Sequence, residues 1–384
     1  MFFKGIISAD SHIVEPPNCY VDFIEPKYRA DAPHVVRQPN GKDIYVIKDL
    51  KQSVPLGLLD SAGMKPAARK HHADTTKFEE TRAGGYNAKA RLVDMDLEGT
   101  AAEIIYASVG MVLCTHPDPA YKDAAMQAYN RWLQTFCADA PDRLFGLAQT
   151  AILSVDSAIE DFRRAKEMGM VGMMMPGNPV HGDYDRPEYD ALWECATDLD
   201  LPICFHILTA KEGDLSSVFA GGRGHKLNGG MKILRAIQDI AGMMVLGGVF
   251  ERHPKLKLVT AEGDAGWMPH YMRRMDHTAF RENEDGIIKG LSKLPSDYIR
   301  SNVFMTFQDD YMAWRNIDYM NYKQLLWAND YPHSDSTWPN SQALLANHAS
   351  GVAPEKLRAI LRENTAEIFN LPLDKIPAMQ MAAE

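Results

Sequence analysis

Short apolar runs recur along the chain, and most of them are followed by a stretch in which apolar residues keep helical spacing. Eight runs are candidate strands: 5–9, 102–107, 144–150, 171–175, 203–205, 256–261, 303–307 and 325–328. They lack strict alternation, which is typical of parallel strands buried on both faces. The helical spacing predicts helices over 119–138, 156–168, 187–199, 231–240 and 355–369.

Eight strand and helix units in series favour a (β/α)8 TIM-like barrel over a doubly wound sheet. A dinucleotide-binding fold would place GxGxxG after its first strand, whereas this chain has Asp10, Ser11 and His12 there. The pattern therefore predicts an α/β protein in which one barrel domain spans residues 1–384.

One region does not follow the repeat. Two apolar segments, 34–37 and 44–47, flank Asn40-Gly41, which is a hairpin signal. We expect an N-terminal insertion at about 15–86 that lies over the barrel mouth.

Composition narrows the classes of partner. The 384 residues include 41 Lys+Arg against 51 Asp+Glu, a net charge of −10, so neither nucleic acid nor an anionic membrane is an expected partner. No apolar run approaches the roughly 20 residues of a spanning helix, and the N-terminus lacks a targeting signal, so a cytoplasmic protein is expected. The five cysteines form no CxxC pair and are expected to be buried, reduced thiols.

Residues able to bind a metal follow four of the predicted strands. Asp10 and His12 are two positions apart on the first strand, so both face the barrel axis and Ser11 faces away. Three more such residues follow the fifth, sixth and eighth strands: His206, Glu262 and Asp330. Each alone is more often an ordinary rim residue, but catalytic groups of a barrel gather at the C-terminal ends of its strands. Two histidines with carboxylates suit Zn, Fe or Mn better than Mg or Ca.

These positions resemble a known family. Asp10-x-His12, His206 and the segment Asp330-Tyr331-Pro332-His333 are similar to the amidohydrolase superfamily, in its amidohydrolase-2 branch, which includes aminocarboxymuconate-semialdehyde decarboxylase. The resemblance covers nearly the whole chain. It implies that Asp10, His12, His206 and Asp330 bind one divalent transition metal, with Zn expected first and Fe or Mn as alternatives.

One position departs from the family pattern. Decarboxylases of this branch carry a histidine after the sixth strand, where this chain has Glu262. A carboxylate there can act as a base or as an extra ligand, but it donates a proton poorly at neutral pH unless burial raises its pKa. His333 follows Asp330 closely and is expected to contact the ligands or the substrate.

Three functions remain open. The first is a metal-dependent hydrolase in which Asp330 or Glu262 takes a proton from water and an amide, ester, thioester or lactone bond of a small molecule is cleaved. The second is a metal-dependent, non-oxidative decarboxylase of an aromatic or unsaturated carboxylic acid. The third is a catalytically silent barrel that only binds. Glu262 favours hydrolysis, and the helix over 355–369 suits a homodimer contact.

Overall fold

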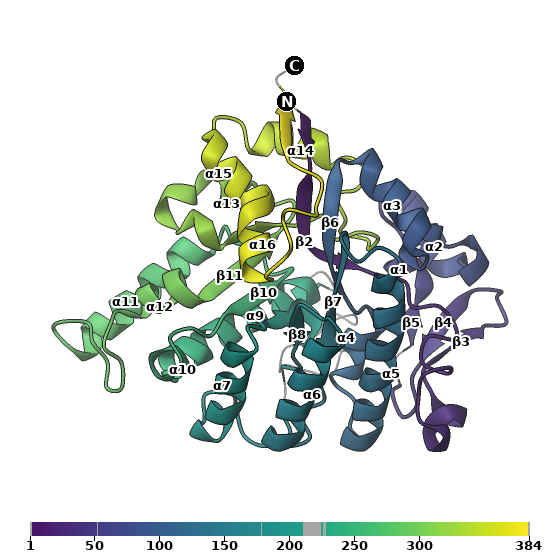
Figure 1. The fold of residues 1–384 in the computed structure, drawn as a ribbon, viewed down its shortest axis with the longest axis horizontal. Helices are drawn as coiled ribbons and strands as arrows, with labels where there is room; N and C mark the ends of the chain where they lie inside the picture. The colour runs from purple at the N-terminus through teal and green to yellow at the C-terminus, as the bar shows by residue number, and fades with distance from the viewer. Residues whose placement is uncertain (1, 52, 178, 210–223, 226–227, 383–384) are drawn as a thin grey trace.

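Eight parallel strands form one sheet in which each strand pairs with the next along the chain (Figure 1). The computed structural model describes residues 2–51, 53–177, 179–209, 224–225 and 228–382. The strands are β2 (Ile6–His12), β6 (Thr100–Tyr106), β7 (Leu144–Gln149), β8 (Gly172–Met174), β9 (Ile203–His206), β10 (Leu258–Ala261), β11 (Val303–Phe307) and β12 (Leu325–Trp327). All residues of these strands are buried, as expected where helices cover the outer face and side chains fill the barrel. The eight predicted strands and the barrel are confirmed.

Helices follow most of the strands and lie outside the sheet (Figure 1). They are α3 (Ala88–Leu97), α4 (Val109–Leu113), α5 (Pro119–Ala138), α6 (Val155–Glu167), α7 (Asp190–Asp198), α9 (Asn228–Leu246), α10 (Val249–Arg252), α11 (Met268–Glu282), α12 (Pro295–Asn302), α13 (Tyr311–Arg315) and α14 (Ser341–His348). The start of α5 shows why a helix begins there, because the Asp118 side chain accepts from the backbone N–H groups of Ala120 and Tyr121 and Pro119 occupies the first turn.

The predicted C-terminal helix is interrupted. It consists of α15 (Pro354–Arg358), a π-helical turn (Ala359–Glu363) and α16 (Asn364–Ile368). Its apolar side chains Ile360, Leu361 and Ala366 are buried within this chain. The segment thus packs against the barrel of its own chain.

The barrel closes between β2 and β12, which share no ladder of hydrogen bonds. Two backbone bonds join them instead: the Asp330 N–H donates to the Asp10 carbonyl at 3.1 Å, and the His12 N–H donates to the Tyr331 carbonyl at 2.6 Å. We call this junction the seam. It brings the first and last barrel strands together at the point where the candidate ligands lie.

Side chains complete the seam. The Asn329 Oδ1 accepts from the hydroxyls of Ser8 and Ser11 at 3.0 Å each, and the Asn329 N–H donates to Ser8 Oγ. Ser11 therefore points away from the barrel axis, as predicted, yet it is fully buried. These bonds satisfy polar groups that would otherwise be buried without partners.

The insertion contains a three-stranded antiparallel sheet and short helices. Its elements are β3 (His34–Arg37), β4 (Asp43–Val46), β5 (Val54–Pro55), α1 (Leu56–Leu59), α2 (Pro66–Thr75) and three 3-10 turns (Pro26–Asp31, Phe78–Glu80, Ala83–Gly85). The β3–β4 pair confirms the predicted hairpin. The Ser61 and Ala62 N–H groups donate to the carbonyl of Pro332, in the loop that follows β12. This contact holds the insertion over the mouth of the barrel.

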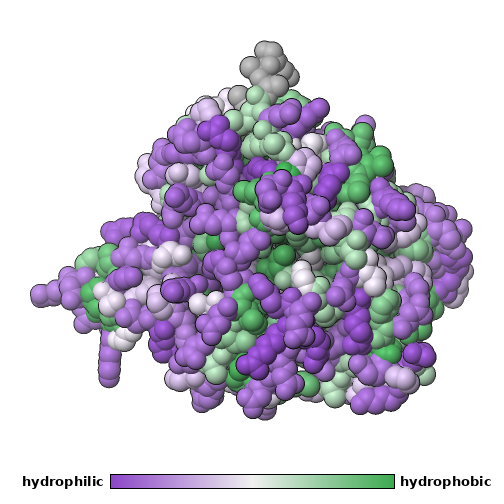
Figure 2. All heavy atoms as spheres, in the orientation of Figure 1, coloured by the Kyte–Doolittle hydropathy of each residue, from purple (hydrophilic) through white to green (hydrophobic). Residues whose placement is uncertain are grey.

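Two very short strands at the ends of the described chain, β1 (Phe2–Lys4) and β13 (Gln380–Ala382), pair with each other. The remaining short elements are 3-10 turns at Pro187–Tyr189, Ile207–Thr209, Ile317–Tyr319 and Tyr322–Gln324. All five cysteines are free, three of them buried and two half-buried. Within the described residues, none of the helices has the length and apolar character needed to cross a membrane. Hydrophilic side chains cover most of the face drawn in Figure 2.

Candidate metal centre

The structure brings together the side chains that the sequence placed at separate strand ends. His12 Nε2 lies 3.0 Å from His206 Nε2 and 3.5 Å from both Asp10 Oδ1 and Asp330 Oδ1. Glu262 Oε2 lies 3.2 Å from His206 Nε2. Four strands, β2, β9, β10 and β12, thus deliver two imidazoles and three carboxylates to one point.

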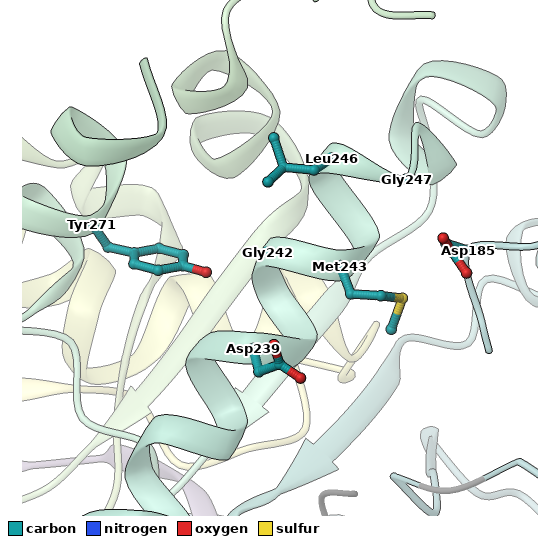
Figure 3. A pocket seen from close by; sticks show the side chains of 7 residues that line it. All are labelled: Asp185, Asp239, Gly242, Met243, Leu246, Gly247 and Tyr271. Carbon is teal, nitrogen blue, oxygen red and sulfur yellow. The ribbon is translucent and has the colours of Figure 1, made fainter. Parts of the chain in front are cut away.

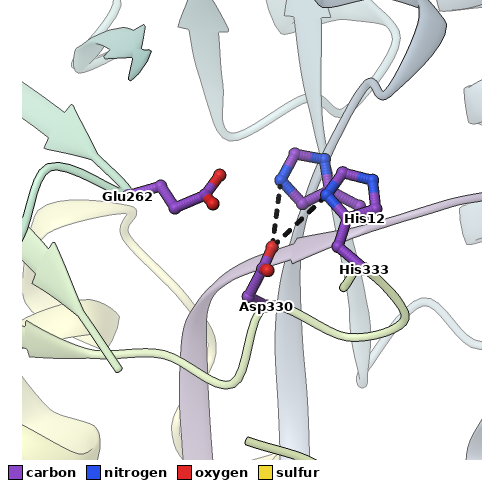
Figure 4. A group of neighbouring side chains, drawn as sticks. All are labelled: His12, Glu262, Asp330 and His333. Atoms are coloured by element: carbon purple, nitrogen blue, oxygen red, sulfur yellow. Dashed lines mark ion pairs between the residues drawn. The ribbon is translucent and has the colours of Figure 1, made fainter. Parts of the chain in front are cut away.

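His333 joins the same cluster. Its ring stacks on that of His12 with the centroids 3.9 Å apart, and its Nδ1 lies 3.5 Å from Asp330 Oδ1. Figure 4 shows Asp330 next to both imidazoles, with the Glu262 carboxylate pointing toward them from another strand end. All six residues expected at the site therefore lie together.

Burial sets the electrostatics of the cluster. Burial raises the pKa of Asp10 well above its usual range, and the nearby Asp330 raises it further. Burial likewise raises the pKa of Asp330 and of Glu262. The pKa values of His12 and His206 are lowered well below the usual range, mainly by burial. Without a cation, the cluster therefore favours neutral groups.

Several polar atoms of the cluster have no hydrogen-bond partner among the described residues. They are Asp10 Oδ1, both carboxylate oxygens of Asp330 and His206 Nδ1. Buried carboxylate oxygens without partners are costly. A bound cation would remove that cost.

The tautomer of His12 also fits a metal. Its Nδ1 lies 3.2 Å from the carbonyl of Ala107, which can only accept, so the ring hydrogen lies on Nδ1 and the lone pair on Nε2. That lone pair faces His206 Nε2 and two carboxylates. Such a hydrogen bond to a backbone carbonyl is the usual support of a metal-binding histidine. Two groups of possible ligand atoms, each within 4.8 Å of one another, share His12: one adds Glu262, Asp330 and His333, the other Asp10 and His206.

Thr306 on β11 connects two members of the cluster and was not found from the sequence. Its hydroxyl donates to Asp10 Oδ2 at 3.1 Å and accepts from the backbone N–H of Glu262 at 2.8 Å. A threonine within an apolar run gave no signal in the sequence.

Glu262 and Asp330 both have left-handed backbone conformations, with φ of 54° and 51°. Non-glycine residues in that region of backbone conformation are uncommon and are concentrated at functional sites.

Arg91 on α3 holds the seam from behind the cluster and was also missed. Its Nη1 donates to the carbonyl of His12 at 2.6 Å, and its Nη2 donates to the carbonyl of Tyr331 at 3.3 Å. Its Nε pairs with Glu103 of β6, and both side chains are almost fully buried. The arginine thus fixes the backbone beside two candidate ligands.

A separate pocket of about 440 Å³ lies on the outer side of the barrel, between α9 and α11 (Figure 3). It is lined by Asp185, Asp239, Gly242, Met243, Leu246, Gly247 and Tyr271. None of these residues follows a barrel strand directly. The chemistry-bearing groups are at the strand ends.

Comparisons with known proteins bear on the family and on the fold. The family model described as amidohydrolase matches residues 115–371. The decarboxylase orsB of Emericella nidulans is 30% identical over 129 residues, which make up 30% of this chain and 36% of that protein. The match therefore spans only about a third of the curated relative.

Solved structures show the same fold. An amidohydrolase from Mycobacterium avium subsp. paratuberculosis K-10 matches with a TM-score of 0.74 and 20% identity, over 95% of this chain and 98% of the other. A 5-carboxyvanillate decarboxylase from Novosphingobium aromaticivorans DSM 12444, solved with bound manganese, matches with a TM-score of 0.65 and 16% identity, over 95% and 97%. The fold is a barrel with a candidate metal site at its strand ends, and the chain belongs to the amidohydrolase family.

Proposed function

We propose that this protein is a metal-dependent, non-oxidative decarboxylase of an aromatic or unsaturated carboxylic acid. The observation that carries the proposal is the 30% identity to a decarboxylase, because the cluster by itself suits hydrolysis and decarboxylation equally. The shared fold of a 5-carboxyvanillate decarboxylase adds support. The expected leading function, hydrolysis, thus becomes the second candidate.

Asp10, His12, His206 and Asp330 would hold one divalent metal. Their imidazole nitrogens and carboxylate oxygens suit Zn, Fe or Mn, and manganese is bound in the Novosphingobium decarboxylase. When bound, the cation would supply positive charge for the substrate carboxylate and a neighbouring hydroxyl.

The protein side chains would handle the proton. Decarboxylation breaks the bond between the ring carbon and the carboxylate carbon, leaves the electron pair on the ring carbon and releases carbon dioxide. The ring carbon then needs one proton from a positioned acid. Glu262 and His333 are the cluster residues available for this step, since their side chains lie beside the proposed ligands His206 and Asp330.

Hydrolysis of an acyl bond is the second candidate because of Glu262. Its carboxylate lies 3.2 Å from His206 Nε2, where decarboxylases of this branch carry a histidine. There it, or Asp330, would take the proton of an attacking water.

An assay in D2O separates the two candidates. The metal-loaded protein would be given hydroxybenzoates and 5-carboxyvanillate in one set, and amides, esters, thioesters and lactones in the other. We expect release of carbon dioxide with one deuterium at the vacated ring carbon, and loss of this activity in Asp330→Asn. Ser301→Ala, which removes an exposed hydroxyl that donates to the carbonyl of Asp297 on α12, serves as the control. Cleavage of an acyl substrate without carbon dioxide would overturn the proposal in favour of hydrolysis.

A further inference from the structure

Ser108, at the start of α4, contacts His333 from the side opposite Asp330. Its hydroxyl oxygen lies 2.7 Å from His333 Nε2 and 2.6 Å from the carbonyl oxygen of Ile13. Ser108 is 1% exposed, so no bulk water competes for these bonds.

The direction of both hydrogen bonds follows from their partners. A backbone carbonyl can only accept, and a serine hydroxyl has one hydrogen. The Ser108 hydrogen therefore lies between Oγ and the Ile13 carbonyl, since two bare oxygens at 2.6 Å would repel each other. The free lone pair of Oγ then faces His333 Nε2, which must carry a hydrogen in order to donate.

This leaves the other ring nitrogen for the cluster. With the hydrogen on Nε2, neutral His333 has its lone pair on Nδ1, the atom 3.5 Å from Asp330 Oδ1. Stacking on the His12 ring at an interplanar angle of 17° keeps His333 from rotating away from this position.

Glu15 fixes Ser108 in turn. One carboxylate oxygen of Glu15 accepts from the backbone N–H of Ser108 at 2.9 Å and from that of Val109 at 2.8 Å. The carboxylate thus holds the first turn of α4, which carries the serine hydroxyl. Glu15 and Ile13 both lie on the segment that follows β2, so the same segment positions the hydroxyl from two directions.

We propose that Ser108 is a positioning residue that holds the His333 hydrogen on Nε2 and so keeps the Nδ1 lone pair facing the cluster, where Nδ1 takes the proton of the hydroxyl beside the substrate carboxylate and the electron pair of that O–H bond stays on oxygen. The role of Nδ1 toward the substrate rests on the proposed function, whereas the position of the hydrogen on Nε2 does not. Glu262, the other available residue, is then left to donate the proton to the ring carbon. His333 supplies, from the loop after β12, the imidazole that the chain lacks at position 262.

Nitrogen NMR tests the tautomer without any substrate. Protein labelled with 15N-histidine would be recorded metal-free and after loading with Zn, and the His333 signals would be identified as those missing from His333→Gln. Long-range correlation between ring hydrogens and nitrogens distinguishes the two tautomers. We expect the Nε2–H pattern in the wild type and in Ser108→Thr, and a mixture of tautomers in Ser108→Ala. An Nδ1–H pattern in the wild type would overturn the proposal.

Kinetics test the role of the tautomer. Ser108→Ala should lower kcat by about 100-fold, in the range of general acid–base effects, while the Kd for Zn stays within about threefold because Ser108 contacts none of the proposed ligands. Ser108→Thr keeps the hydroxyl and should restore most of kcat. Ser301→Ala, at an exposed hydroxyl on α12, should behave as the wild type. A loss of kcat in Ser108→Ala that follows loss of Zn binding would refute the positioning role.

Failure of every decarboxylation substrate would count against the proposed function. The NMR result on the tautomer of His333 would not be affected by that failure.

Discussion

Glu15 is a fully buried carboxylate that no described lysine or arginine neutralises. Burial raises its pKa from 4.5 to about 7, although the N–H groups of Ser108 and Val109 lower it in part. Because the folded pKa lies above the unfolded one, the folded state holds the proton more tightly. Its contribution to stability is therefore fully present below pH 4.5 and is lost as the pH rises through about 7.

Glu15→Gln should remove this pH dependence. The glutamine oxygen can still accept both backbone N–H groups, but the side chain no longer titrates. Between pH 4.5 and 8, the wild type should lose about 3 kcal/mol of unfolding free energy relative to Glu15→Gln. Urea titrations of both metal-free proteins at several pH values measure the difference. Parallel curves would show that Glu15 does not titrate in this range.

The proposed ligands were predictable as a set, because each lies at or just after the end of an apolar run and the ends of the barrel strands meet. Asp10, His206 and Asp330 are at positions where chain order alone gives the location of a side chain in a barrel. Ser108 and Thr306 were not predictable, because their roles consist of contacts with residues far away in the sequence. His12 Nδ1, for example, is fixed by the carbonyl of Ala107, which any residue would supply.

At the level of elements, α3 reverses the usual pattern of an amphipathic helix. Its apolar Val93 and Leu97 are 62% and 63% exposed, while its charged Arg91 and Asp94 are buried. Figure 2 shows an apolar area at the upper right, where Figure 1 places α3. A prediction from apolar periodicity would therefore have placed Val93 and Leu97 in the core and Arg91 and Asp94 on the surface, which is the reverse of the observed orientation. This is why the support of the seam could not be found from the sequence.

Arg91→Met should test how much the seam depends on α3. The change leaves Glu103 buried without its partner, which typically costs about 3–5 kcal/mol. Metal affinity should fall as well, because the carbonyl of His12 loses a donor. Urea unfolding and Zn titration measure the two effects.

Lys356→Met is the matched control for that experiment. Lys356 pairs with Asp318, which is 83% exposed, and such surface pairs contribute little to stability. If Arg91→Met cost no more than this control, the seam would not depend on the arginine.

For the whole molecule, the sequence predicted the architecture better than the chemistry. Eight apolar runs in series define a barrel regardless of the reaction it performs. The choice between hydrolysis and decarboxylation turned on Glu262, and the expectation drawn from it is less well supported than the decarboxylase alternative. One side chain does not determine the reaction, because the same fold carries many different chemistries.

Metal binding should stabilise the whole fold. The buried carboxylates of Asp10 and Asp330 lack partners, so a cation would bind the folded state and not the unfolded chain. At 100 times its Kd, Zn or Mn should add about 2.7 kcal/mol to the free energy of unfolding. Asp330→Asn should abolish the gain, whereas Asp297→Asn, at a half-exposed carboxylate on α12, should keep it. If the metal raised the free energy of unfolding equally in both variants, the cation would bind at a site that does not include Asp330.

The seam also determines at what point during synthesis of the chain the full set of proposed metal ligands can come together. Its partners Ser8 and Asn329 are 321 residues apart, and at about 5–20 residues per second their synthesis is separated by roughly 20–60 s. Asp10, His12 and His206 are all made before Asp330. A nascent chain therefore offers only part of the proposed ligand set, and the full set appears when the last barrel strand joins the first. Order of synthesis thus makes the complete set of proposed ligands available only after closure of the barrel.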